Sequence, residues 1–404
     1  TPFGSVDAFI AEVTSGGVAA MEMIAADMKA MGNYIARSLS FDGVTYGRLE
    51  HALSPEQQKV YGTYCTAWQT VLRNIAEALE VSGGKNSRQA RSVALSAFWS
   101  ANQRFFNQVL TSLQMPTLLK DIEQQLKDGK SVILQLTNTN EAQLKRQLDN
   151  LEDGALEDLD LTPTEIISQF VESSFPVAQM EEYTDENGNK RYRVVIDSNG
   201  NVVLNKDAVA MRDKLLDELG SIRRIDGPLD MIINHFGPDA VAEITGRTTR
   251  VVWRDGENGK ERVKENRSKR HSEAEENDFM SGKKRILVFS EAGGTGRSFH
   301  ADLSKKNQQH RIHYLVQAGW KADAAIQGLG RSHRTNEASQ PHYVLCSTNV
   351  PAQVRFTSTI ARRLDQLGAL TRGQRQTGSQ GIFQAKDNLE NEYAAQAVHG
   401  FIRD

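Results

Sequence analysis

The second half of the sequence alternates short apolar runs with segments of helical periodicity, and this alternation restricts the fold more than any other feature. Three apolar runs lie at 285–290 (RILVFS), 311–316 (RIHYLV) and 342–347 (HYVLCS). Helices are expected between them over 324–329, and after them from 351 to 367. Strands that alternate with helices form mostly parallel sheets covered on both faces. The run SVILQL (131–136) has the same character and is expected to join this α/β sheet.

The first part of the chain is predicted to be helical. An Ala- and Met-rich helix is expected over 16–42, and another over 88–113. Between them, Ser54-Pro55-Glu56-Gln57 has the pattern of a capping box with proline in the first turn. We therefore expect a helical segment over 1–114.

The middle of the chain is predicted to be an α+β insertion over 151–280, within an α/β lobe formed by 115–150 and 281–404. Thr162-Pro163-Thr164-Glu165 has the pattern of a second capping box. Asn199-Gly200 predicts a hairpin within 192–204. The DxNGN segments at Asp185 and Asp197 lack the other ligands of a calcium-binding loop and indicate turns. The charged stretch 254–284 is expected to be a mobile loop.

The overall composition excludes several classes of protein. The net charge is -3, so the sequence has no global positive charge that would indicate a nucleic-acid partner, although a local basic patch is still compatible with it. Two cysteines without a CxxC pair argue against a disulfide framework or a cysteine-rich zinc site. No apolar run approaches the roughly 20 residues that span a bilayer. We expect no membrane partner.

A glycine-rich segment follows the strand at 285–290. Residues 290–298 (SEAGGTGRS) hold three glycines within four positions, which lets the backbone turn tightly and present N–H groups to a phosphate. An ordinary strand-to-helix turn would have the same pattern. This segment alone leaves both interpretations open.

A second motif follows the next strand, at 327–334 (QGLGRSHR). Arg331 and Arg334 are three residues apart and are expected on one face of a helical turn. Arginine suits bidentate contact with phosphate oxygens and stabilises charge on a transferring phosphoryl group. A solvated basic helix face is the alternative for an isolated RxxR pair. The spacing of the two motifs across one strand favours a joint phosphate-binding function.

The two motifs resemble motifs V and VI of superfamily 2 helicases, and more specifically those of the strawberry notch family. The similarity includes 290–302 (SEAGGTGRSFHAD), 319–336 (GWKADAAIQGLGRSHRTN), 355–375, 20–41, 98–106 and 242–252. It implies a RecA-like parallel sheet with helices on both faces, the second lobe of an ATP-dependent DNA helicase or translocase. A non-catalytic helicase-like module that binds nucleic acid or a regulatory protein is the alternative.

The resemblance implies roles for the matching positions. Arg331 and Arg334 would be catalytic, reaching the γ-phosphate of ATP, with Arg334 the better candidate for the arginine finger. The residues expected to shape the ATP contact are Gly294, Gly296, Gln327 and Gly330. Nucleic-acid contacts are expected from Thr295 and Arg297, and from Thr137 and Asn138, where motif IV would lie. Contacts of this kind give affinity without sequence preference.

The departures from a complete motor are equally informative. No GxxxxGK[ST] segment and no DExH-type acidic pair occur, so the sequence lacks the usual means of holding ATP and Mg²⁺. Gly129-Lys130-Ser131 ends like a Walker A motif, but it precedes a strand instead of opening a helix. ATP with Mg²⁺ is therefore expected to be held mainly by a first RecA-like lobe, upstream or in a partner chain. Alone, these 404 residues are expected to bind ATP poorly and not to hydrolyse it.

Other candidates have weaker patterns. The histidines between 300 and 342 lack zinc-ligand spacing, so no metal site is predicted. The aromatic residues at 98, 99, 105 and 106 are expected in a helix core, although they could stack on bases. Arg247, Arg250 and Arg254 with Trp253 form a basic and aromatic patch, and Arg247 and Arg250 are candidate DNA contacts. The expected location is the cytoplasm of a bacterial or phage-host cell, or the nucleus if the source is eukaryotic.

Overall fold

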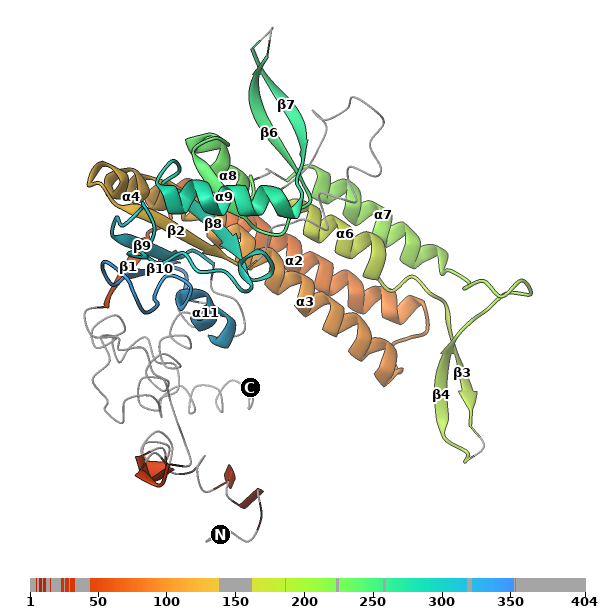
Figure 1. Cartoon of the computed structure of the whole chain (residues 1–404). Coiled ribbons are helices and arrows are strands. Elements are labelled where there is room, and N and C mark those ends of the chain that lie inside the picture. Colours follow the sequence, from red (N-terminus) through yellow and green to blue (C-terminus); the bar gives the residue numbers. More distant parts are fainter. Residues whose placement is uncertain are drawn as a thin grey trace. The chain divides into compact units, whose positions relative to one another are not determined.

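The computed structural model describes residues 44–137, 162–185, 187–222, 225–256, 259–317, 322–351 and 353, with scattered positions before residue 44. The chain divides into two compact units, drawn with their elements labelled in Figure 1. One comprises Thr1–His51, Pro116–Glu141 and Ile232–Asp404; the other comprises Ala52–Met115 and Ala142–Met231. We call them the sheet unit and the helical unit.

A six-stranded sheet forms the centre of the sheet unit, in the order β1-β10-β9-β2-β8-β5. Every neighbouring pair in this sheet is parallel. The strands are β1 (Thr45–His51), β2 (Ser131–Leu136), β5 (Val241–Ile244), β8 (Ile286–Ser290), β9 (Arg311–Leu315) and β10 (His342–Thr348). The α/β fold predicted from the sequence is confirmed, and so are the four strands expected from the apolar runs.

Helices cover the sheet because its central strands carry apolar side chains on both faces. All residues of β2, β5, β8 and β9 are buried, as expected of a parallel sheet packed on both faces. Helix α9 (Lys269–Ser281) contributes Phe279 and Met280 to a core cluster with residues of β2, β5 and β8. Helix α11 (Ala322–Leu329) packs Leu329 against Tyr343 of β10. Helix α4 (Met115–Lys127) places Asp121 at the hydroxyl of Tyr314.

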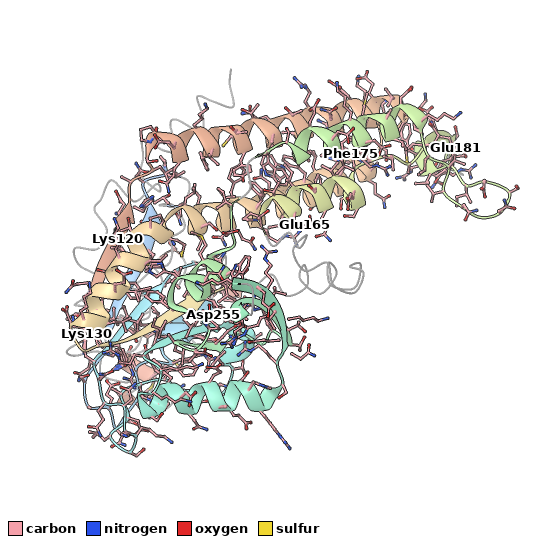
Figure 2. All side chains as sticks on the ribbon, turned by 90° about the horizontal axis from the view of Figure 1, so that it is seen from above. Lys120, Lys130, Glu165, Phe175, Glu181 and Asp255 are labelled. Carbon is pink, nitrogen blue, oxygen red and sulfur yellow. The ribbon has the colours of Figure 1, made fainter. Side chains whose placement is uncertain are left out.

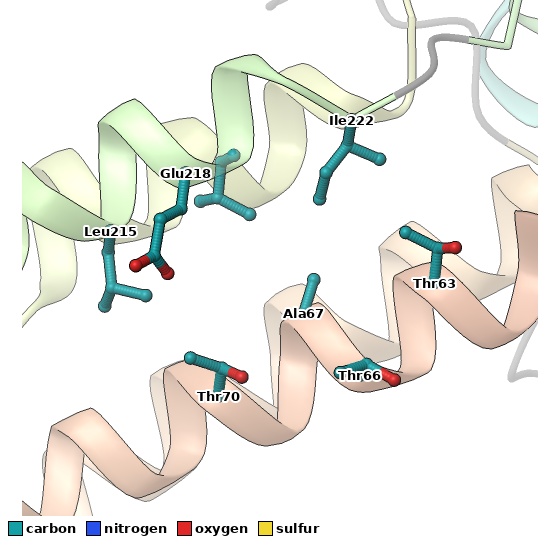
Figure 3. Close-up of a pocket in the computed structure, with 8 residues that line it drawn as sticks. Thr63, Thr66, Ala67, Thr70, Leu215, Glu218 and Ile222 are labelled. Carbon is teal, nitrogen blue, oxygen red and sulfur yellow. The ribbon is translucent and has the colours of Figure 1, made fainter.

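The helical unit is built on α2 (Pro55–Val81), α3 (Arg88–Leu113), α6 (Thr164–Ser174) and α7 (Lys206–Gly220). Helix α2 begins as predicted, since Ser54 and Gln57 form both hydrogen bonds of the capping box. Trp68, Phe98 and Phe105 are buried in the core and pack edge to face, so these aromatic residues are core residues. Trp99 is half exposed. Figure 3 shows a groove between α2 and α7 lined by threonines and leucines.

The start of the first helix in the middle of the chain differs from the prediction. Helix α6 has Pro163 at its N-cap, one residue after the expected Thr162, and Pro163 has no side-chain capping hydrogen bond. A short hairpin forms around Asn199-Gly200, as predicted: Ile196 and Val202 form an antiparallel bridge, and the Val203 amide donates to the Val195 carbonyl at 2.9 Å. Another hairpin, which joins β3 (Met180–Thr184) to β4 (Lys190–Val194), was not predicted. Asp185 and Asp197 accept backbone hydrogen bonds within their turns, as predicted.

The stretch 254–284 is not a loop, and this prediction was wrong. It contains most of an antiparallel hairpin, β6 (Thr249–Gly256) and β7 (Gly259–Asn266), followed by α9. The hairpin is charged on both strands because most of its surface faces solvent, so it lacks the apolar pattern of a buried strand.

The units also differ from the predicted division of the chain. Strand β1 belongs to the sheet, although 1–114 was expected to be a helical segment. Strand β5 and α9 also lie in the sheet unit, together with α8 (Pro228–Phe236) from Ile232 on, so the insertion ends near residue 231 instead of 280. The helix expected after Pro351 and most of the helix expected over 16–42 lie outside the described residues. No helix of the described part is long and apolar enough to cross a membrane.

Candidate functional site

The glycine turn after β8 is fixed by contacts with the end of β5. Ser290 caps the short helix α10 (Glu291–Gly294), and its hydroxyl donates to the carbonyl of Thr245 at 2.7 Å. A Cβ atom on Gly293 would overlap the carbonyl group of Ile244. Only glycine allows this close approach, so the turn is held directly on the edge strand β5.

The other two glycines of the turn serve different purposes. A Cβ on Gly294 would lie 2.8 Å from the ring of Phe289 and 3.2 Å from Nε of Arg331. The side chain of Arg331 therefore lies directly against Gly294, and a larger residue at this position would displace it. Gly296 has φ +75°, a left-handed conformation that favours glycine. Thr295 between them is exposed, and its hydroxyl donates to the carbonyl of Glu291.

The second motif departs from its predicted geometry. Helix α11 ends at Leu329, and Arg331 and Arg334 lie beyond it in a turn and an irregular segment. They do not share one face of a helical turn as expected. Gly328 packs so closely on Gln135 of β2 that a Cβ atom would overlap this side chain, which fixes the end of α11 on the sheet. The turn continues through a hydrogen bond from the Arg331 amide to the Gly328 carbonyl.

Buried polar groups hold the end of α11. The hydroxyls of Ser332 and Tyr343 both donate to the carbonyl of Leu329, at 3.0 and 2.9 Å. Because the Ser332 proton is used in this way, its oxygen accepts from Nδ1 of His313 at 2.7 Å. His313 is fully buried in the sheet. The network positions the turn that begins at Gly330.

Acidification is expected to weaken the sheet unit through His313. Burial lowers the pKa of this imidazole from 6.5 to about 3. The unfolded chain therefore binds a proton below pH 6.5 that the folded chain does not, and stability falls as the pH is lowered from 6.5. At pH 5 the loss from this group is about 2 kcal/mol.

Chemical denaturation of the wild type and of His313→Gln at pH 7.5 and pH 5 measures this effect. The difference in unfolding free energy between the two pH values should be smaller in the variant by about 2 kcal/mol. An equal difference in both proteins would assign the acid sensitivity to other groups.

The two motifs meet at Arg331. Its Nη1 donates to the carbonyl of Arg297 at 3.2 Å, and its own carbonyl accepts from the amide of Phe299 at 2.7 Å. Burial lowers the pKa of Arg331, and the positive charge of Arg334 lowers it further, whereas Glu291 opposes this shift. The glycine turn and the arginine segment thus form one continuous surface.

Arg334 is the exposed member of the pair. Its amide donates to the carboxylate of Glu337, which also binds His333. Its guanidinium group forms no hydrogen bond or ion pair with any residue that the structure describes. Of the two arginines, Arg331 is held in place and Arg334 is open to a ligand.

The remaining predicted site residues are divided between this surface and other places. Gln327 is exposed on the last turn of α11, and Gly330 follows that helix. Arg297 forms an ion pair with Glu276 of α9, so its guanidinium group is already engaged. The amide and hydroxyl of Thr137 both donate to the side-chain oxygen of Gln317, at 3.1 and 2.9 Å. Asn138 lies outside the described residues.

Arg247 and Arg250 are interior residues. Their side chains are 2% and 7% exposed, and both pair with the fully buried carboxylate of Glu243, as does Arg267. Guanidinium groups in this cluster are not accessible to a nucleic-acid phosphate. The structure therefore excludes these two arginines from the candidate contact surface, and it assigns them to the support of β5.

The residues that support the site were not predicted from the sequence. Glu243, Gln135, His313 and Ser332 hold the two motifs in position, yet none belongs to the predicted set. Gln135 and His313 had a recognisable signal, since each is a polar residue inside an apolar strand (SVILQL and RIHYLV). A buried polar residue needs a partner and so marks a place where an element is anchored.

Gly129-Lys130-Ser131 does not have the structure of a phosphate-binding loop. Gly129 ends α4 with φ +78°, and Ser131 begins β2 with a buried side chain. Nζ of Lys130 donates to Gln125 at 2.7 Å. Among the residues with described positions, no group of three His, Cys, Asp or Glu side chains could hold a metal ion.

Comparison with known proteins identifies the region that carries this surface. Residues 227–404 match a family model described as the C-terminal domain on strawberry notch homologues. Residues 1–63 match a second model, described as P-loop containing NTP hydrolase pore-1.

Curated relatives extend the similarity to nearly the whole chain. Strawberry notch homolog 2 of Mus musculus is 32% identical over 98% of this chain, and strawberry notch homolog 1 of Rattus norvegicus is 31% identical over 98%. Protein FORGETTER 1 of Arabidopsis thaliana is 24% identical over 98%. The chain spans about a third of the length of these relatives, 34%, 36% and 39% respectively.

Among solved structures, the C-terminal part of the Fun30 ATPase domain aligns with 88% of this chain and 98% of its own length. The TM-score is 0.29 and the identity 12%, so this alignment carries no argument about the fold. The sequence matches, together with the parallel sheet that bears the two motifs, support the assignment to a family. The chain belongs to the strawberry notch family and contains the C-terminal helicase-like module of that family.

Proposed function

We propose that this chain supplies the second lobe of an ATP-dependent DNA translocase, in which Arg331 and Arg334 reach the γ-phosphate of an ATP bound with Mg²⁺ on a first lobe. The observation that carries the proposal is the contact of Arg331 with Gly294 and with the Arg297 carbonyl. This contact joins the two motifs into one surface and leaves Arg334 exposed beside it.

The charges of this surface favour an anion. Burial lowers the pKa of Arg331, and the positive charge of Arg334 lowers it further, so repulsion between the two arginines adds to the cost of burying the Arg331 charge. A triphosphate placed against them would relieve this repulsion, and a planar guanidinium can bind two phosphate oxygens at once. The sequence has no GxxxxGK[ST] segment to cradle the other phosphates, so we propose that ATP binds productively only when the first lobe is present.

The same surface offers a route from nucleotide to nucleic acid. Thr295 is exposed one residue after Gly294, which contacts the arginine. A strand phosphate bound at Thr295 would lie on the same turn that orients Arg331. We propose the exposed turn at Thr295 and Gly296 as part of the track for DNA. Thr137 is left out of this track, because its amide and hydroxyl both donate to Gln317 and are not available to a phosphate. Backbone contacts of this kind give affinity that depends on salt and not on sequence.

DNA binding by the complete natural polypeptide that carries this chain tests the proposal. Electrophoretic mobility shifts with single- and double-stranded DNA should be measured at two salt concentrations, with and without a non-hydrolysable ATP analogue. For a translocase we expect salt-sensitive binding whose affinity changes several-fold with the analogue, together with DNA-stimulated ATP hydrolysis.

The alternative is a helicase-like module that binds nucleic acid or a regulatory protein without hydrolysing ATP. Tight, salt-sensitive binding that does not respond to the analogue, with no ATP hydrolysis, would favour this module and reject the translocase.

A further inference from the structure

The β6–β7 hairpin of the sheet unit has two faces of different character. In its register Trp253 pairs with Arg262, and Arg254 pairs with Glu261. Successive side chains of a strand point to opposite faces, and directly paired residues share a face. One face therefore carries Arg250, Val252, Arg254, Glu261, Val263 and Glu265. The other carries Val251, Trp253, Asp255, Lys260, Arg262 and Lys264.

The first face is neutralised and partly packed. Arg250 and Arg254 both pair with Glu265, at 2.8 and 2.7 Å, and Arg254 also pairs with Asp239 at 2.6 Å. Val252 is 2% exposed. The arginines that the sequence suggested as DNA contacts thus bind the protein itself. This face attaches the hairpin to the sheet unit.

The second face, which we call the Trp253 face, is basic and aromatic. Trp253 is 41% exposed, and the guanidinium carbon of Arg262 lies 5.3 Å from the centre of its ring. Lys260, Lys264 and Asp255 are exposed as well, and Asp255 is labelled in Figure 2. Three cations (Lys260, Arg262, Lys264) against one anion (Asp255) give this face a net charge of +2. The indole is thus partly exposed among cations on a projecting hairpin (Figure 1).

We propose that the Trp253 face binds single-stranded nucleic acid, with a base stacked on the indole ring and with Lys260, Arg262 and Lys264 facing phosphates. Aromatic side chains stack on bases whose faces are open, which a duplex does not offer. The cations supply the complementary charge for the backbone. This inference rests on the proposed function, since it assumes that the protein acts on nucleic acid.

The base of the hairpin is connected to the glycine turn of the candidate site. Arg250 at the start of β6 and Arg267 just after β7 both bind Glu243 of β5. The Arg267 amide also donates to the Thr248 carbonyl at 2.6 Å, which closes the base of the hairpin. The end of β5 in turn contacts Gly293 and Ser290. The hairpin that would bind a nucleic-acid strand at Trp253 is therefore attached to β5, the same β-strand that supports the glycine turn.

Fluorescence anisotropy of labelled 20-nucleotide single strands, in both DNA and RNA form, tests the inference in the complete polypeptide. Trp253→Ala should weaken single-strand binding roughly tenfold and leave binding to a blunt duplex within about twofold. Trp253→Phe should retain most of the affinity. Trp99→Ala removes another half-exposed tryptophan, in the helical unit, and should have no effect. Lys260→Ala with Lys264→Ala should reduce the slope of log affinity against log salt by about 1.4.

The outcomes separate this inference from the proposed function. If the wild type binds DNA and responds to ATP, but Trp253→Ala binds single strands equally well with an unchanged circular dichroism spectrum, only the hairpin inference fails. If the wild type binds none of the oligonucleotides, both the hairpin inference and the proposed function fail. If only one of the two strands, DNA or RNA, is affected by Trp253→Ala, that strand is the ligand.

Discussion

Arg334→Ala in the complete polypeptide is expected to lower kcat for DNA-stimulated ATP hydrolysis by about 10³-fold or more. An arginine finger stabilises charge that develops on the transferring phosphoryl group, and its removal typically costs between about 10³- and 10⁵-fold in rate. The Arg334 side chain is exposed and is not part of any described ion pair, so its loss should leave the fold unchanged. KM for ATP should change far less than kcat, because the contact strengthens in the transition state.

Three companion variants make this result specific. Arg334→Lys retains the charge but loses the bidentate geometry, so it should recover only a small part of the rate. Arg270→Ala removes another exposed arginine of the sheet unit and should have wild-type turnover. Arg331→Ala should also reduce the rate, but with some loss of stability because Arg331 anchors the two motifs. Wild-type turnover in Arg334→Ala would reject its assignment as the arginine finger.

The sheet could be predicted from the sequence because its strands are buried on both faces. A parallel strand such as β8 must be continuously apolar, and a run like ILVFS between polar segments is easy to recognise. Strand β1 escaped prediction because TYGRLEH, at the edge of the sheet, is only partly buried. Strand β5 escaped because it has four residues, one of which is the charged Glu243.

The hairpin β6–β7 was not predicted because its strands are charged and mostly exposed instead of apolar and buried. Its stability comes from cross-strand ion pairs such as Arg250–Glu265 and from the buried carboxylate of Glu243, which belongs to another element. Sequence periodicity reports burial against a core, and it carries no information about which charged residues will pair. A charged stretch with Gly and Asn therefore looked like a loop.

The two motifs of the candidate site could be recognised from the sequence, but the residues that hold them in place could not. Arg331 and Gly294 were chosen from separate motifs, and the structure brings them together. Their positions depend on contacts across the sheet, such as those from His313 to Ser332 and from Gln135 to the Ala325 carbonyl of α11. Pairs that are distant in the sequence leave no local pattern. Arg247 and Arg250 show the converse: the residue type suits DNA, but burial decides their role.

Glu243→Gln is expected to destabilise the sheet unit by about 3 kcal/mol or more. Burial by itself raises the pKa of this carboxyl group, but the charges of Arg247 and Arg267, with hydrogen bonds from Arg247 and Thr245, outweigh burial and lower the pKa from 4.5 to about 2. A shift of this size corresponds to about 3 kcal/mol of stabilisation. This contribution is complete above pH 4.5 and is lost as the pH falls through about 2. Removing the charge also leaves three buried guanidinium groups without their shared partner, and such losses typically cost about 3–5 kcal/mol.

Chemical denaturation at pH 7 measures this loss, and two matched variants separate it from a general effect of removing a carboxylate. Glu265→Gln removes a half-buried partner of Arg250 and Arg254 and should cost about 1 kcal/mol. Glu181→Gln breaks an exposed pair with Arg193 in the helical unit and should cost less than about 0.5 kcal/mol. Equal losses in all three variants would show that the buried cluster contributes nothing particular. Because the end of β5 holds Ser290 and Gly293, faster hydrogen exchange at the glycine turn in Glu243→Gln alone would show that the cluster supports the candidate site.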